Sequence, residues 1–365
     1  MPAPGPANAR QAHPRRDAFT VRAPGCVTLI GDLTDTNDGH VLSVAIEQSV
    51  RVHVRRLDDQ RIVLRSPWSA EPARFGVGGT LESGNKGWDR VLAGVIADYQ
   101  ALGWDIPGFE AGMESSLPVG AGLGSGAVAI AVAIETLCGR SLPAEERALR
   151  CPVAEHAIAV IGARAGHALL LDCRSRGIRQ VPLVGCEVAF LVLDSGVTRS
   201  LADHQSAARR SECLEAARAL GKQSLRDVDE TLWRRWQDEL PAVLQRRASH
   251  VLSENARALA CAAALEAGNW LRAGELMLES HRSLAGDYEV SCPEVDALHA
   301  RVAAQPGVFG CRMTGGGRGR CVVALVEAAR AETIAAAAVA GYHQATGHAA
   351  TAFVTTAAAG AGVER

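Results

Sequence analysis

The chain has 365 residues, which is more than one ordinary core accommodates and predicts two domains. Hydrophobic residues make up 48% and charged residues 21%, a composition typical of globular proteins and not of disordered ones. The net charge of −2 gives no electrostatic reason to expect nucleic acid as a partner. We expect a small-molecule ligand, and a monomer or dimer.

The cysteines and the N-terminus point to a reducing compartment. The ten cysteines are scattered without a CxxC pair, which argues against a structural zinc site. Residues 1–20 are rich in Pro, Ala and Arg, lack the apolar core of a signal peptide, and predict a flexible tail. No apolar run reaches the length of a membrane span without polar interruption. We therefore expect a cytoplasmic protein that does not enter a membrane.

The first regular elements surround an acidic loop. Residues 26–30 predict a short strand, and the Gly, Asp and Asn content of residues 31–39 predicts a loop. Apolar or alternating runs at 40–46 and 50–54 predict strands. Helical spacing of apolar residues predicts a helix over 88–102.

A glycine-rich stretch follows at residues 118–127, Pro-Val-Gly-Ala-Gly-Leu-Gly-Ser-Gly-Ala, and the apolar run 128–137 after it predicts a buried helix. Glycine inside a helix or strand costs about 0.5–1 kcal/mol relative to Ala, so the stretch predicts a loop that lets a ligand approach the backbone. Free N–H groups and the dipole at a helix N-terminus favour an anion, which predicts a phosphate site. A tight loop without a ligand is the alternative.

The rest of the chain continues the mixture of strands and helices. A helix at 147–161 and strands at 168–172 and 188–193 are predicted, with a domain boundary near Gly185 that separates domains 21–185 and 186–365. Residues 200–303 are helical in pattern throughout. A second glycine cluster, a strand, an alanine-rich helix and a final strand follow at 313–320, 321–326, 331–341 and 351–355. These elements predict a two-domain α+β protein.

Three motifs resemble the galactokinase branch of the GHMP kinases. They are Ala23-Pro-Gly with the Leu29–Gly39 loop, Leu117-Pro-Val-Gly-Ala-Gly-Leu-Gly-Ser-Gly-Ala127, and Arg312-Met-Thr-Gly-Gly-Gly317. The likeness extends over nearly everything from residue 23 to residue 360. It implies an N-terminal domain like ribosomal protein S5 domain 2, a ferredoxin-like C-terminal domain, ATP with Mg²⁺, and a sugar hydroxyl as the phosphoryl acceptor.

The resemblance also implies roles for individual residues. Those implied or expected at the substrate are Asp32, Asp35, Asp38 and His40, the last two being alternatively plain turn residues. Those implied at the nucleotide are Trp88, Pro118, Gly120, Gly122, Leu123, Gly124, Ser125, Gly126, Gly315 and Gly316, with Ser125 as a candidate magnesium ligand. Trp88 matches an aromatic residue beside adenine, and the alternative is that it anchors its helix in the core.

Several positions depart from the family pattern. Cys26 stands where the family has an Arg, Asp32 where it has a Glu, and Leu33 where it has a His. The stretch between Ala154-Glu-His156 and Gly166 holds nine residues, too few for the segment that carries the family's catalytic Asp. Gly124 and Gly126 stand where relatives have serines. A base and a cation near the transferred phosphate typically contribute ~10²–10⁴-fold and ~10³–10⁵-fold to the rate.

Four residues are candidates to replace the missing groups. Arg318 and Arg320 would supply positive charge to a phosphate, unless they point to solvent. Cys26 would be a nucleophile only beside a base or cation and is otherwise a packing residue. His156 falls opposite the catalytic Asp when no gap is introduced and is otherwise a structural histidine.

These departures predict that ordinary galactokinase activity is improbable. The first hypothesis is a divergent enzyme that binds ATP or a related phosphate-bearing ligand and acts on a small polar molecule, sugar-derived or otherwise, with altered chemistry. The second is an inactive pseudokinase that senses a ligand or serves as a scaffold. The third is that nucleotide binding has also been lost and the site serves unrelated chemistry.

Overall fold

The computed structural model describes residues 17–67, 69–75, 81–83, 87–118, 123–151, 154–184, 187–197, 202–315 and 321–364. The chain forms two compact units, Met1–Gly25 with Gln48–Gly162 and Gly360–Arg365, and Cys26–Glu47 with Ala163–Ala359. The strands β1 (Ala18–Ile30) and β2 (His40–Arg56) each contribute residues to both units. Gly185, where the sequence predicts the domain boundary, lies outside the described residues, and that boundary stays a prediction.

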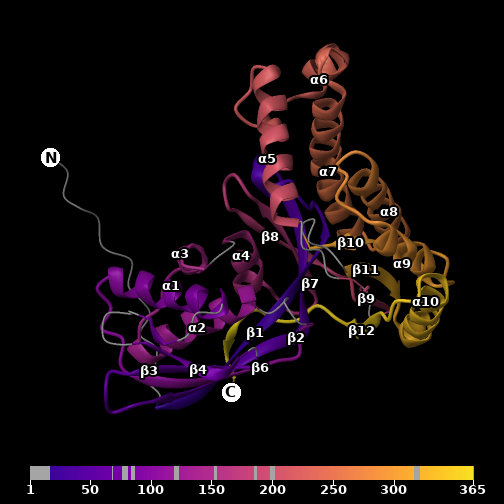
Figure 1. Cartoon of the computed structure of the whole chain (residues 1–365). Coiled ribbons are helices and arrows are strands. Elements are labelled where there is room, and N and C mark those ends of the chain that lie inside the picture. The colour runs from indigo at the N-terminus through magenta and orange to yellow at the C-terminus, as the bar shows by residue number, and fades with distance from the viewer. Residues whose placement is uncertain are drawn as a thin grey trace. The chain divides into compact units, whose positions relative to one another are not determined.

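The first unit is a twisted sheet with helices on one face (Figure 1). Its remaining strands are β3 (Ile62–Ser66), β4 (Ser69–Phe75), β5 (Leu81–Ser83), β6 (Phe109–Ser115) and β13 (Gly362–Val363). The strand order is β13-β1-β2-β6-β3-β4-β5, with β3 and β6 parallel. Sequence reasoning did not predict β3 to β6, because charged residues and Pro72 interrupt the alternation in this part of the chain.

The helices of this unit are α1 (Gly87–Ala101), α2 (Leu123–Cys138), α3 (Ala144–Ala148) and α4 (Ala154–Gly162). In α2 every residue from Ser125 to Leu137 is buried, which explains its run of Ala, Val and Ile. Glu135 is the one charged residue of α2, and it accepts hydrogen bonds from the Tyr99 hydroxyl at 2.6 Å and the Arg147 guanidinium at 2.6 and 2.8 Å. The buried charge is therefore fully partnered.

The second unit is built on a four-stranded antiparallel sheet of order β10-β11-β9-β12. The four strands are Val308–Thr314 (β10), Cys321–Glu327 (β11), Val188–Asp194 (β9) and Thr351–Thr355 (β12). Separately, the start of β2 pairs with β7 (His167–Asp172), which pairs with β8 (Ile178–Pro182). The strands predicted at 168–172, 188–193, 321–326 and 351–355 are confirmed.

The second unit also contains helices, and these form most of residues 202–303, as the pattern of residues 200–303 predicts. They are α5 (Ala202–Ala219), α6 (Glu230–Trp236), α7 (Ala242–Glu266), α8 (Trp270–Gly286), α9 (Pro293–Ala303) and α10 (Ala331–Thr346), with a 3₁₀ turn at Leu225–Asp227. α8, α9 and α10 pack against the four-stranded sheet (Figure 1). Gly274 of α8 and Gly310 of β10 bring the two backbones into direct contact, because a Cβ on Gly274 would lie 2.0 Å from the carbonyl oxygen of Phe309.

Candidate functional site

The acidic loop, residues 31–40, joins β1 to β2 within the second unit and carries the predicted substrate-binding residues. It turns through a 3₁₀ helix at Asp35–Asn37, and Leu33 and Asp38 have positive φ angles of 68° and 58°. Residues other than glycine seldom adopt such angles. The shape of the loop must therefore be held by its surroundings, and the contacts of Asp32, Asp38 and His40 show how.

Asp32 is held by a buried ion pair. Its Oδ2 accepts a hydrogen bond of 2.6 Å from Nη2 of Arg312 on β10, and Arg312 is fully buried. Asp32 itself is 8% exposed, so the pair lies almost wholly within the protein. Removing one partner from a buried pair typically costs about 3–5 kcal/mol, so the pair fixes the carboxylate firmly.

Cys26 does not have the chemistry of a nucleophile. Desolvation raises the pKa of its thiol to about 12, and a hydrogen bond with Ser43 offsets only part of that rise. The negative charge of Asp32 raises the pKa further. The thiolate is the reactive form of cysteine, so a thiol that stays protonated at neutral pH is a packing residue. The candidate role of Cys26 as a nucleophile is thus corrected.

A second polar network holds the end of the acidic loop. Arg226 donates two hydrogen bonds of 3.0 Å to the carboxylate of Asp172 and a third to the carbonyl oxygen of Asp38. The contact with Arg226 lowers the pKa of Asp172 well below its usual range. The carboxylate of Asp38 pairs with Arg174 at 3.3 Å, and Nε2 of His40 lies 3.7 Å from Asp172. Both predicted residues at this end of the loop therefore take part in structural contacts.

The glycine-rich stretch enters α2 earlier than predicted. The helix begins at Leu123 and not after Ala127, so Gly124, Ser125 and Gly126 form its first turn. The hydroxyl of Ser125 is fully buried and donates a 2.8 Å hydrogen bond to the carbonyl oxygen of Pro24. The structure therefore gives the Ser125 hydroxyl a backbone partner, and its role as a magnesium ligand stays a prediction.

His156 lies against the first turn of α2. A Cβ on Gly124 would lie 2.8 Å from Cδ2 and 3.1 Å from Nε2 of His156, which α4 carries. Desolvation lowers the pKa of His156 to about 4, so its imidazole is neutral at pH 7. Only four residues, 163–166, separate the end of α4 from β7. A larger residue at position 124 would clash with the imidazole of His156, so this position favours glycine. The sequence did not predict this contact.

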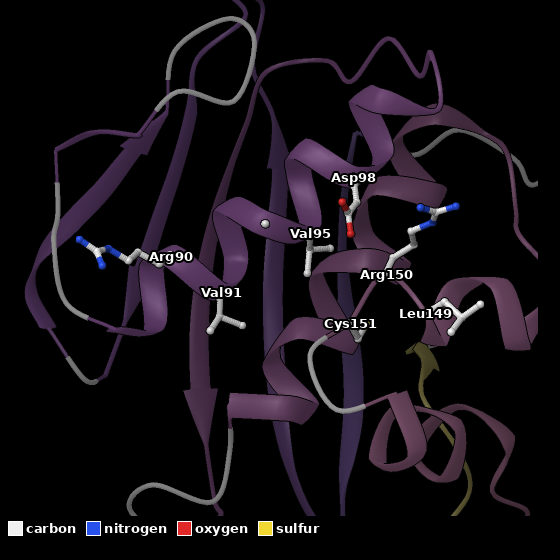
Figure 2. A pocket seen from close by; sticks show the side chains of 8 residues that line it. Arg90, Val91, Val95, Asp98, Leu149, Arg150 and Cys151 are labelled. Atoms are coloured by element: carbon white, nitrogen blue, oxygen red, sulfur yellow. The ribbon is translucent and has the colours of Figure 1, made fainter. Parts of the chain in front are cut away.

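A pocket of about 320 Å³ lies between α1 and the segment before α4 (Figure 2). Its lining consists of Arg90, Val91, Gly94, Val95 and Asp98 of α1 and of Leu149, Arg150 and Cys151 before α4. Trp88, predicted to lie beside adenine, does not line it. Trp88 is 8% exposed and its indole Nε1 is buried, which favours its role as a core anchor.

Several predicted site residues cannot be placed. Gly120, Gly122, Gly316, Arg318 and Arg320 lie outside the described residues. Pro118 ends the segment before the glycine stretch, and Gly315 follows β10 with a φ of 104°, an angle that favours glycine. Asp35 is described and partly buried within the 3₁₀ turn of the acidic loop.

Sequence reasoning missed the residues that support the acidic loop. Four residues contact the loop from at least 188 positions further along the chain than the loop residue that each one bonds: Arg226, Glu254, Asn255 and Arg312. One signal was available in α7, where His250 and Glu254 stand at helical spacing on a buried face that is apolar apart from them and Arg247. Polar residues at such positions need partners, and here the partner is the loop.

Comparison with known proteins defines the class first. Residues 90–168 match the model of the GHMP kinases N terminal domain, and residues 261–344 match GHMP kinases C terminal. A mevalonate kinase crystal structure, 17% identical, superposes with a TM-score of 0.59 over 93% of this chain and 98% of its own. The chain therefore has the GHMP kinase fold, and the predicted fold class is confirmed.

The particular family follows from closer matches. Residues 10–56 match the galactokinase galactose-binding signature. The galactokinase of Roseiflexus sp. (strain RS-1) is 41% identical over 362 residues, covering 94% of this chain and 92% of its own, and that of Homo sapiens is 41% identical over 335 residues, covering 86% and 85%. The structure of Lactococcus lactis galactokinase complexed with galactose, 26% identical, superposes with a TM-score of 0.87 over 95% of both chains. The chain belongs to the galactokinase family.

These findings overturn the functional prediction drawn from the departures. Identity of 41% over most of both chains supports ordinary galactokinase function, not a divergent enzyme or an inactive pseudokinase. The prediction rested on several departures taken together, among them Cys26, Leu33 and the short segment between His156 and Gly166. In the structure such positions have partners from distant parts of the chain, as Asp32 has in Arg312. The residue type at one motif position therefore does not by itself indicate whether the site is active.

Proposed function

We propose that this protein is a galactokinase, which transfers the γ-phosphoryl group of ATP to a hydroxyl of galactose. The observation that carries the proposal is the match of residues 10–56 to the galactose-binding signature, which includes the whole acidic loop. Within this loop Asp32, Asp35 and Asp38 supply carboxylates, which accept hydrogen bonds from sugar hydroxyls. The ion pair with Arg312 and the network around Arg226 support a preorganised acceptor site.

The first turn of α2 fits the phosphates of ATP. It contains no acidic residue, and the small, partly buried Gly124 leaves room for an anion at this end of the helix, where backbone N–H groups lack helical partners. The helix dipole adds partial positive charge at this end. When bound, ATP supplies the phosphoryl group that is transferred. The neutral imidazole of His156 borders this turn and is a candidate for contact with the phosphates.

We assign no protein ligand for Mg²⁺ among the described residues. The hydroxyl of Ser125 is buried and bonded to Pro24, and the described part of the chain contains no group of three or more His, Cys, Asp or Glu side chains that would hold a metal ion. We therefore derive no step through a protein-bound metal. Phosphoryl transfer depends chiefly on positioning and on stabilisation of charge. The contribution of the chain is to hold the acceptor loop and the anion-binding helix terminus in fixed shapes.

The protein is proposed to be cytoplasmic, as the sequence predicts. No described helix is both long enough and apolar enough to cross a membrane. Cys151, Cys213, Cys261 and Cys311 are buried free thiols, which supports a reducing, cytoplasmic location. We propose a monomer or dimer that acts without nucleic acid.

The proposal is tested by incubating the protein with ATP, magnesium and galactose and measuring ADP release in a coupled assay. The product is identified by mass spectrometry as galactose carrying one phosphoryl group. Glucose and a sugar-free reaction serve as controls, and Asp35→Asn tests the acceptor loop. We expect ADP release that requires galactose and falls strongly in the variant. Absence of phosphorylated galactose from the wild-type reaction would refute the proposal.

A further inference from the structure

The acidic loop is closed at its base. The hydroxyl of Thr34 lies 2.9 Å from the carbonyl oxygens of both Gly31 and His40. A Cβ on Gly31 would lie 2.3 Å from the oxygen of His40, and the φ of Gly31 is +96°. The two ends of the loop are therefore in contact. Side chains that bind Gly31 and His40 also determine the orientation of the loop residues between them.

One face of α7 holds both ends. Glu254 accepts a 2.9 Å hydrogen bond from the backbone N–H of Gly31 through Oε1. Its neighbour Asn255 accepts a 2.8 Å hydrogen bond from the backbone N–H of His40 through Oδ1, and Nδ1 of His40 lies 2.9 Å from the same oxygen. One turn earlier, Nε2 of His250 lies 3.4 Å from the carbonyl oxygen of Asp32. His250 and Glu254 are four residues apart and share a helix face, and Asn255 reaches the loop from the position next to Glu254.

Glu254 is an unusual residue for a merely structural position. It is fully buried, and besides Gly31 it accepts hydrogen bonds from the hydroxyl of Ser280 at 2.6 Å and from Nε of Arg257 at 2.8 Å. Burial alone would raise its pKa, but the positive charge of Arg312 foremost lowers it to about 2, so the carboxylate is ionised. Apolar residues of similar volume often stabilise an interior as well as a buried ion pair does. The retained charge instead anchors one specific backbone amide.

Through that amide, Glu254 also fixes the residue that follows it. Asp32 is adjacent to Gly31 in the chain, and its carboxylate is held from the other side by Arg312 at 2.6 Å. The position of Asp32 is thus constrained twice. α7 holds the backbone of the preceding residue, Gly31, and Arg312 of β10 holds the Asp32 carboxylate. A shift of Gly31 would turn Asp32 away from the geometry that the ion pair defines.

We propose that Glu254, assisted by Asn255, is a positioning residue for the sugar acceptor, acting by holding Gly31 and His40 so that the carboxylates of the acidic loop meet the sugar hydroxyls. This inference rests on the proposed function, because it takes the acidic loop to be the galactose-binding segment. Neither residue needs to touch the sugar. We expect Glu254 and Asn255 to affect the binding of galactose and not the binding of ATP.

The test compares Glu254→Gln with wild type. Gln keeps the size of the side chain and an oxygen for Gly31, but it loses the charge that faces Arg257 and Arg312. With ATP saturating, we expect the KM for galactose to rise roughly tenfold, whereas the KM for ATP with galactose saturating stays within about twofold. Glu266→Gln is the matched control, because Glu266 lies on the same helix and pairs with Arg179 at the surface. It should leave both KM values unchanged.

A second pair of variants applies if Glu254→Gln does not fold. Asn255 is partly buried, and Asn255→Ala should raise the KM for galactose several-fold, while Asn255→Asp, which still presents an oxygen to His40, should recover most of the loss. Hydrogen–deuterium exchange provides a readout that is independent of turnover. We expect faster exchange in the peptide that contains residues 31–40 in Glu254→Gln and in Asn255→Ala, but not in Glu266→Gln.

The failures can be told apart. A wild-type protein that does not phosphorylate galactose refutes the proposed function and, with it, this inference. An active wild type whose variants lose kcat alone, with both KM values and the exchange of residues 31–40 unchanged, refutes the positioning role only. Equal rises in the KM for galactose and the KM for ATP also refute it, because they indicate general damage to the fold.

Discussion

The closest approach of two elements in the second unit yields a sharp prediction. Gly274 of α8 packs directly on β10, where a Cβ would lie 2.0 Å from the oxygen and 2.2 Å from the carbon of the Phe309 carbonyl. Both obstacles are backbone atoms, so no side-chain rotation relieves the clash. In Gly274→Ala the helix and the strand must move apart by about 1 Å to restore ordinary contact distances.

The magnitude follows from two opposing effects. Overpacking of a core typically costs about 1–3 kcal/mol, and the backbone clash here favours the upper end. Ala gains about 1 kcal/mol over Gly inside a helix. We therefore expect the free energy of unfolding to fall by about 2 kcal/mol. For a unit of this size that lowers Tm by roughly 4–8 °C.

The assay is urea unfolding followed by circular dichroism, with Gly286→Ala as the control. Gly286 also lies on α8, but no atom lies within 4 Å of a Cβ there, so this variant should gain up to about 1 kcal/mol. Because α8 carries Ser280, which bonds Glu254, Gly274→Ala should also raise the KM for galactose. A Gly274→Ala protein as stable as wild type would refute the packing argument.

Three further predictions concern the two candidate sites. Gly124→Ser should raise the KM for ATP about tenfold by displacing His156, and Gly124→Ser/His156→Ala should recover most of that loss in the same assay; a double variant no better than the single one contradicts the steric account. Burial lowers the pKa of His250 to about 4, whereas an unfolded histidine titrates near 6.5, so the free energy of unfolding should fall as the pH drops from about 6.5 to about 4, and pH-dependent urea titrations should show a shallower slope for His250→Gln. Arg226→Gln should raise the KM for galactose several-fold, and Arg226→Lys should restore little, because an ammonium group cannot form the bidentate contact with Asp172. Arg234→Gln breaks only a surface pair with Glu230, and a similar rise in this variant would argue against the role of Arg226.

The sequence motifs led to the right family but to the wrong prediction about activity. Sequence reasoning identified the family from the resemblance of three motifs. It then interpreted Cys26, Leu33 and the short segment between His156 and Gly166 as signs of lost activity. Relatives that are 41% identical over most of the chain contradict that reading. A short sequence motif does not contain the partners that determine what its residues do.

Local sequence determined the α+β class, the helical character of residues 200–303, and the glycine-rich entry to α2. The tertiary structure alone decided which side chains act together. The acidic loop meets α7 and β10 at separations of more than 200 residues, and neither the amide of Gly31 nor the carboxylate of Asp32 reveals its partner in the sequence. Hydrogen bonds and ion pairs depend on distance in space, which only the packing of α7, α8 and β10 fixes. The same packing decided that Ser125 is a backbone partner and that Gly124 makes room for an imidazole.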